Sequence, residues 1–282
     1  MSGPGQRRSG YGRIAWLAAV LASGCAHYAP APPIPPPVAA VPVGVAGLAD
    51  FARRRVATLL WGAEQLSLTQ AIGADGSLQT GFKFSPRGEF GRGKATAVDT
   101  RGYFLTAAHC VRREPVYLVW TEDSGGIPRS RLLRVRVVFQ GEAAGEGTDL
   151  AVLRVGQPLG QVFAWGAVPP PGTPVASVGQ DSAPAGNTGI AMDLLGGRFL
   201  GGTPHPEAAP PRVTLFHTTL IQRGDSGGPV LDLAGRLLAI NVAYAMGEES
   251  VGIAIRVHAT AHRPDLAWLS AVIDSDWRSH PG

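Results

Sequence analysis

The chain has 282 residues, of which 45% are hydrophobic and only 16% are charged, which excludes a disordered acidic chain and a coiled coil. Glycine and proline are frequent, with 38 and 24 residues, and this favours many short strands and tight turns over a helical bundle. The formal charge of +4 falls to +1 (4 − 3) without Arg7, Arg8 and Arg13 of the N-terminal segment, so we expect no nucleic-acid partner.

Residues 1–25 are typical of an export signal. A basic segment, "MSGPGQRRSGYGR", precedes the apolar stretch "IAWLAAVLA", which is too short to stay in a bilayer as a spanning helix. The following "LASGC" resembles the lipobox of bacterial lipoproteins, and this resemblance implies that Cys25 carries a lipid anchor. Ala26 then indicates the outer membrane, facing the periplasm. The alternative is an ordinary signal peptide, cleaved for secretion or retained in the membrane.

Two segments separate the signal from the β-rich part of the chain. Residues 26–47 form a tether rich in Pro, Ala and Val, a composition that favours extended polyproline II and builds no packed core. Residues 48–81 are expected to be an N-terminal extension. Apolar residues near helical spacing predict a helix over 48–68, and the segment "GADGSLQTGFKFSPRGEF" predicts turns and a hairpin.

From Gly91 onwards, short apolar runs alternate with Gly, Pro and Asp. Strand-length runs such as "YFLTAA", "LAVLRV", "PVASVG" and "LLAINVAY" predict an all-β sandwich or barrel. The segment "PDLAWLSAVI" at 264–273 opens with Pro-Asp and continues with helical spacing, which predicts a C-terminal helix. We therefore expect a single β domain over residues 82–275.

The segment "RGDSGGPV" at 223–230 allows two interpretations. It places Ser226 in the pattern G-x-S-x-G, which marks the nucleophile turn of α/β-hydrolases but also the serine loop of two-barrel proteases. An α/β-hydrolase needs its acid and its histidine after the serine, and the residues after Ser226 leave no room for strand–helix crossovers. The opposite order is present, because His109 in "TAAHC" and Asp149 in "TDLAVL" both precede Ser226.

With these three motifs in this order, the sequence resembles the trypsin-like (chymotrypsin-fold) serine proteases over about residues 82–273. Its spacing and the tail "LLAINVAYAMGEESVGIAIRV" are more similar to the bacterial HtrA/V8-type branch. The resemblance implies two perpendicular six-stranded β-barrels with the catalytic triad in the cleft between them. It also implies an endopeptidase that acts on protein or peptide substrates with no metal and no cofactor.

The chemistry explains why these residue types occur together. A serine hydroxyl is a poor nucleophile, so His109 would take the proton of Ser226, while Asp149 would fix the imidazole tautomer. The glycines around the serine would let the N–H groups of Gly224 and Ser226 form the oxyanion hole. The alternative is a latent or catalytically silent relative that serves as a binding or sensor module of the cell envelope.

The residues that match the family's primary specificity pocket are apolar. This match places Leu220 at the base of the pocket, Val242, Ala243 and Tyr244 on one wall, and Gly252 to Ala254 on the other. We therefore expect a small or medium apolar side chain before the scissile bond.

Asp225 matches the residue that pairs with a freed N-terminal amine in zymogen-activated relatives. No activation sequence precedes His109, so Asp225 needs another partner, such as Arg223, or is exposed to solvent. Cys110 has no cysteine partner if Cys25 is lipidated, and we expect it to be a small buried residue.

Three further histidines are assigned no catalytic role. His217, nine residues before the serine, is expected to be an ordinary strand residue. His258 and His262 are four residues apart, but no third ligand accompanies them, so no metal site is predicted.

Overall fold

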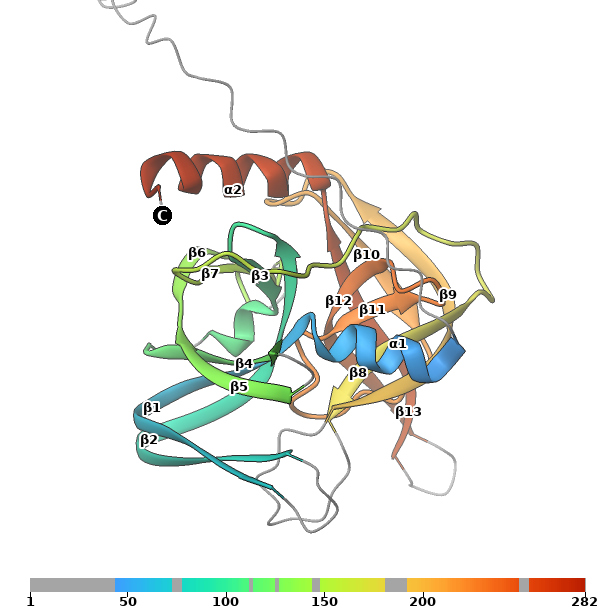
Figure 1. Ribbon diagram of the computed structural model, residues 1–282. Helices are drawn as coiled ribbons and strands as arrows, with labels where there is room; N and C mark the ends of the chain where they lie inside the picture. The colour runs from blue at the N-terminus through green and yellow to red at the C-terminus, as the bar shows by residue number, and fades with distance from the viewer. Residues whose placement is uncertain are drawn as a thin grey trace, which may run out of the picture. The chain divides into compact units, whose positions relative to one another are not determined.

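A computed structural model describes residues 44–72, 78–111, 114–124, 127–143, 148–180, 192–248 and 254–281 (Figure 1). All of them belong to one compact unit, Pro36–Gly282. The elements are mainly strands, joined by helices α1 (Gly44–Arg53) and α2 (Leu266–Ser279) and a short 3-10 helix, Ala108–Cys110. This confirms the all-β prediction with a C-terminal helix. Of the helices in the described segments, none has the length and apolar character needed to cross a membrane.

The N-terminal half forms a seven-stranded sheet in the spatial order β5-β4-β1-β2-β3-β7-β6. Val135 alone separates the two outermost strands along the chain, and its N–H donates to Val116 O at 3.2 Å, which curls the sheet back on itself. The strands are β1 (Val56–Ile72), β2 (Leu78–Asp99), β3 (Tyr103–Thr106), β4 (Val116–Ser124), β5 (Ile127–Arg134), β6 (Arg136–Gln140) and β7 (Ala151–Arg154).

The C-terminal half forms a closed barrel of six strands in the order β10-β13-β12-β11-β8-β9. The two halves stand side by side in Figure 1 and together form the expected double barrel, although the first half has seven strands rather than six. The strands of the second barrel are β8 (Pro174–Gln180), β9 (Met192–His205), β10 (Arg212–His217), β11 (Pro229–Asp232), β12 (Leu237–Glu248) and β13 (Ala254–Pro264).

The helix predicted over 48–68 is wrong beyond Arg53, whereas the hairpin predicted after it is present, because β1 and β2 pair antiparallel with Ile72 opposite Leu78. Helix α1 ends at Arg53, and strand β1 begins at Val56, where it pairs with β2 and β4 in the middle of the first sheet. The β domain therefore starts well before residue 82. Five consecutive residues, 56–60, are buried, and a run buried on both faces cannot be distinguished from a buried helix by its periodicity.

Helix α2 is longer than predicted and continues to Ser279. Its first turn is capped by Asp265, whose carboxylate accepts the N–H of Trp268 at 2.8 Å. The helix lies across the strands of the first half in Figure 1.

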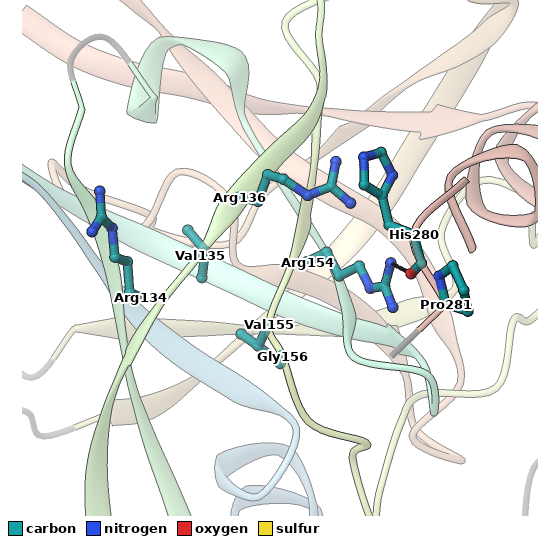
Figure 2. Close-up of a pocket in the computed structure, with 8 residues that line it drawn as sticks. All are labelled: Arg134, Val135, Arg136, Arg154, Val155, Gly156, His280 and Pro281. Carbon is teal, nitrogen blue, oxygen red and sulfur yellow. Dashed lines mark hydrogen bonds between the residues drawn. The ribbon is translucent and has the colours of Figure 1, made fainter. Parts of the chain in front are cut away.

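One buried carboxylate, Asp276, holds the end of this helix on the first sheet. It accepts hydrogen bonds from Tyr103 Oη at 2.8 Å, Arg136 Nη2 at 2.6 Å and Arg154 Nη1 at 3.3 Å. Arg154 also donates to the carbonyl of His280, as Figure 2 shows. Burial opposes ionisation of Asp276, but these donors outweigh it and lower its pKa.

A shared hydrophobic cluster joins the two halves of the molecule. Its buried members come from both sheets and from both helices, and they include Leu48, Tyr103, Leu231, Ile240 and Leu269. The two barrels therefore pack on a common core, which fixes the position of one barrel relative to the other.

Candidate active site

His109 is held by a single carboxylate at two points. It lies in the 3-10 helix that follows β3, and its Nδ1 is 2.8 Å from Asp149 Oδ2. Its backbone N–H donates to Asp149 Oδ1 at 2.9 Å. Because a carboxylate only accepts, Nδ1 carries the proton in this bond and Nε2 is available as the base. The side chain is 26% exposed, so a substrate can reach it.

The backbone of Asp149 adopts a conformation that non-glycine residues rarely take. Its φ is +40°, in the left-handed region, and such strain persists only where surrounding contacts hold it. The preceding carbonyl, of Thr148, accepts a hydrogen bond from His262 Nδ1 at 2.6 Å. The following carbonyl, of Leu150, accepts the N–H of Gly141 at 2.9 Å. Contacts on both sides of Asp149 thus aim its carboxylate at His109.

The hydrogen bond between these two residues changes the basicity of the imidazole. Burial of the ring opposes its positive charge, but the bond to Asp149 outweighs burial and raises the pKa of His109 above 6.5. An imidazole can accept a proton only in its neutral form, so any reaction that uses His109 as a base should become faster as the pH rises through this raised pKa.

Ser226 lies in the loop between β10 and β11 and is fixed by strands of both halves. From the second barrel, Asn241 O accepts the N–H of Gly227 at 2.8 Å. From the first sheet, the N–H of Lys94 donates to Ser226 O at 2.7 Å, and Thr96 Oγ1 donates to Gly227 O at 2.9 Å. Strand β2 and strand β12 together therefore set the position of the serine.

Gly227 must be glycine for two reasons. Its φ is +84°, which L side chains rarely adopt. A Cβ at this position would also lie 1.9 Å from the carbonyl oxygen of Lys94 and 2.3 Å from Thr106 Oγ1. The glycine thus permits the close approach of the serine loop to strand β2.

Two backbone N–H groups beside the nucleophile are available to a ligand. Within the described part of the chain, the N–H groups of Gly224 and Ser226 donate to no protein group, whereas that of Asp225 between them donates to Gln222 O at 3.0 Å. Gly224 and Ser226 are both partly exposed. These are the donors that the sequence suggested for an oxyanion hole.

The histidine and serine segments meet where Cys110 contacts the serine loop. Cys110 Sγ lies 3.7 Å from Ser226 O, and Cys110 directly follows His109. A Cβ on Gly93 of strand β2 would lie 2.6 Å from this sulfur, so the contact is tight. Cys110 is a free cysteine and 2% exposed, as expected for a small buried residue.

The residues predicted to form the specificity pocket lie in different surroundings. Leu220 is wrong as the base of a pocket, because its side chain is 67% exposed. The two predicted walls do not face each other either. Ala243 and Tyr244 pair with Thr260 and Ala259, whereas Ala254 pairs with Glu248 further along the hairpin. An alignment by motif cannot detect such a shift in strand register.

Other predicted pocket and anchor residues have separate outcomes. Val242 is 5% exposed and belongs to the core of the first half, whereas Ala243 is exposed. Gly252 and the proposed lipid-bearing Cys25 lie outside the described residues.

Asp225 is completely buried, which excludes the alternative that it is exposed to solvent. Its carboxylate accepts the N–H of Gln222 at 2.7 Å. Arg223 is exposed, and the negative charge of Asp225 acts on Lys94 of strand β2. Sequence reasoning missed this lysine because strand and loop lie far apart along the chain. The available signal was a lysine at the start of the apolar run "KATAV".

The remaining histidines have structural partners. His217 is fully buried between Asn241 and Thr219, and burial lowers its pKa to about 4, so it is neutral. His258 and His262 lie on strand β13 rather than on a helix. Among the described residues, no group of three or more potential metal ligands occurs.

Two cavities lie away from these residues. One of about 380 Å³ is lined by side chains of β5–β7 and the C-terminus, and Figure 2 shows three arginines around it, Arg134, Arg136 and Arg154. The other, of about 690 Å³, lies beside β9 and β10 and is lined in part by Arg212, Thr214 and Phe216. His109, Asp149 and Ser226 line neither cavity.

Comparison with known proteins agrees with this arrangement. The sequence profile of the trypsin-like peptidase domain matches residues 91–240, which is more than half of the chain. HhoA of Synechocystis sp., to which a serine protease activity is ascribed, is 30% identical over 176 residues, which is 59% of this chain and 40% of that protein. The chain thus matches well under half of that relative's length.

Solved structures show the same fold. The HtrA-type protease AlgW with a tripeptide superposes with a TM-score of 0.55 at 18% identity, covering 81% of this chain and 62% of that one. AlgW with a decapeptide gives a TM-score of 0.54 at 18% identity, with 82% and 66% covered.

Proposed function

Because the chain belongs to the trypsin-like peptidase family, we propose that it is an exported serine endopeptidase that uses His109, Asp149 and Ser226 as its triad. The observation that carries the proposal is the pair of hydrogen bonds that the ring and the backbone N–H of His109 donate to Asp149, at 2.8 and 2.9 Å. A carboxylate held in a strained backbone conformation and committed to one histidine is expected of a catalytic pair.

In the proposed reaction, Ser226 Oγ bonds to the carbonyl carbon of the substrate while its proton passes to Nε2 of His109. Negative charge on the carbonyl oxygen is stabilised by the N–H groups of Gly224 and Ser226. The carbon–nitrogen bond then breaks, and the leaving amine takes the proton from His109. Water attacks the acyl-enzyme in the same way, which releases the acid and restores Ser226.

A preference for small or medium apolar side chains before the scissile bond is part of this proposal. Val242 and Ala243 directly follow Asn241, whose carbonyl binds Gly227 beside the nucleophile. Of these two residues, Ala243 is exposed, so strand β12 offers a small apolar surface two residues from the one that holds the serine loop. Cleavage of a peptide library that varies this substrate position tests the preference, and faster cleavage after Arg or Glu than after Ala, Val or Leu would contradict it.

The export part of the proposal includes a lipid anchor at Cys25, with the domain facing the periplasm on the outer membrane. It is supported by the signal-like segment and the "LASGC" sequence. Metabolic labelling with an alkyne fatty acid tests it. Label should enter the wild-type protein and be absent from Cys25→Ala, and equal labelling of both would show that Cys25 is not the anchor.

The decisive experiment treats the full chain with a fluorophosphonate, which reacts with activated serines, and locates the adduct by peptide mass spectrometry. Labelling should occur at Ser226 and be lost in Ser226→Ala and His109→Ala. If the folded wild-type protein stays unlabelled, the latent or silent sensor module replaces the endopeptidase as the proposed function.

A further inference from the structure

Lys94 is a buried lysine in a chain that has very few lysines. The chain has only two lysines, Lys83 and Lys94, among its 25 basic Lys and Arg residues. Lys94 lies in the middle of the first sheet on strand β2 and is 2% exposed. A buried ammonium ion costs several kcal/mol unless an opposite charge compensates it, so such a residue calls for an explanation.

The compensating charge is Asp225, the residue between the two oxyanion donors. Asp225 is 0% exposed, and its negative charge acts on Lys94 across the barrel interface. The stem of Lys94 passes along the serine loop, because a Cβ on Gly228 would lie 3.5 Å from Lys94 Cγ. A compact ammonium on a slim stem suits this narrow path better than a planar guanidinium would.

The backbone of the same residue also touches the nucleophile. The N–H of Lys94 donates to Ser226 O at 2.7 Å, and its carbonyl accepts from Thr106 Oγ1 at 2.6 Å, next to the histidine segment. Lys94 thus contacts the serine loop through its main chain, while its side chain lies in the electrostatic field of Asp225.

We propose that Lys94 is the built-in cation that holds Asp225 inward and thereby keeps the N–H groups of Gly224 and Ser226 in position. The inference rests on the proposed function. It makes Lys94 a positioning residue and explains how the site can be formed without a freed N-terminal amine. Rotation of Asp225 away from the interior would turn the peptide unit that follows it, which carries the N–H of Ser226, and would shift Gly224 on its other side.

The proposed effect of Lys94 on the oxyanion donors depends on pH, because only the protonated lysine is charged. Burial lowers the pKa of Lys94 to about 8, while Asp225 raises it and Arg92 on the same strand lowers it. These two are the charged groups that act on Lys94, and the nearby Cys110 thiol faces the adjacent Gly93. Above about pH 8 the neutral lysine no longer compensates Asp225, so oxyanion stabilisation should decline.

The test compares Lys94→Met, Asp225→Asn and the double variant by their rates of fluorophosphonate labelling at Ser226. Lys94→Met should label at least ten times more slowly at pH 7, and adding Asp225→Asn to it should cause little further loss. The ratio of the wild-type rate to the Lys94→Met rate should fall above about pH 8, because the deprotonation of His109 acts on both rates alike. Arg92→Met, which removes an exposed charge from the same strand, is the matched control and should label normally.

A second measurement is independent of activity. With only two lysines, ¹³C-lysine NMR resolves the titration of Lys94 in the full chain, and its pKa should fall further in Asp225→Asn. An unchanged pKa in that variant, or wild-type labelling rates in Lys94→Met, would overturn the inference. If wild-type Ser226 does not label at all, the proposed function fails, and the titration alone decides whether Lys94 and Asp225 form a pair.

Discussion

At the scale of single residues, the site depends on close contacts that hold each side chain and backbone segment in one position. The carboxylate of Asp149 is committed to His109, and the serine loop approaches strand β2 so closely that only Gly227 fits there. The three motifs predicted these residues, because each motif is a short and continuous segment of the sequence. The role of Lys94 was not predictable, because it follows from a contact between distant segments.

Replacing Asp149 with Asn should slow fluorophosphonate labelling by about 10⁴-fold, because the amide favours the wrong imidazole tautomer. The pH profile should shift as well. Asp149 raises the pKa of His109, so the neutral base becomes available only at higher pH in the wild type, and the midpoint should move down in Asp149→Asn. Rates measured from pH 5 to 11, across the pKa of about 10 that His109 has beside Asp149, would show this, and an unchanged midpoint would contradict it.

Gly227→Ala should reduce labelling of Ser226 by roughly 10²–10³-fold, the range seen when one oxyanion donor is lost. The new methyl group would lie 1.9 Å from Lys94 O and would push the loop from the sheet. Gly172→Ala is the matched control. Gly172 has a similar φ, +86°, but nothing lies within 4 Å of a Cβ there. It should lose some stability and keep its labelling rate.

At the scale of elements, the sequence predicted the segment that has a clear helical pattern and mispredicted two segments that lack the usual pattern or composition of a strand. The C-terminal helix was predicted because it is amphipathic and begins with an Asp cap. The strand Val56–Ile72 was mistaken for a helix because its first residues are buried without alternation. Strand β9 was missed, since its "LGGRFLGG" segment lacks the β-branched residues that normally signal a strand.

Helix α2 offers a test of anchoring by a buried charge. Asp276→Ala should lower the free energy of unfolding by about 3–5 kcal/mol, because it leaves Arg136 and Arg154 without their shared partner. Asp50→Ala breaks an exposed pair with Arg53 and should change stability by about 0–1 kcal/mol. Urea denaturation of both variants would measure the difference, and equal losses would refute the anchoring role.

At the scale of the whole molecule, the proposed triad is divided between two barrels. His109 and Asp149 belong to the first half and Ser226 to the second, while the shared cluster holds the halves together. The double-barrel fold followed from the resemblance of the motifs. The seven-strand first sheet and the packing of helix α1 did not, because they depend on pairing between distant segments.

The common core should therefore influence catalysis as well as stability. Leu231→Ala, at 0% exposure, should cost about 2–5 kcal/mol and slow labelling, because a cavity between the barrels loosens their alignment. Leu233→Ala, two residues away and 55% exposed, should leave both unchanged. Thermal unfolding and labelling of the pair would test this, and normal labelling in a destabilised Leu231→Ala would separate the two effects.

The connection between β7 and β8 has a practical consequence. It runs from Val155 to Thr173 and includes the exposed residues Pro170 and Gly172. A chain cut there would give one fragment with His109 and Asp149 and another with Ser226, so neither fragment would hold the whole proposed triad. Peptide cleavage would then be expected only when the two fragments associate. Each fragment could be fused to one of two candidate binding partners, and cleavage would detect the association of the partners.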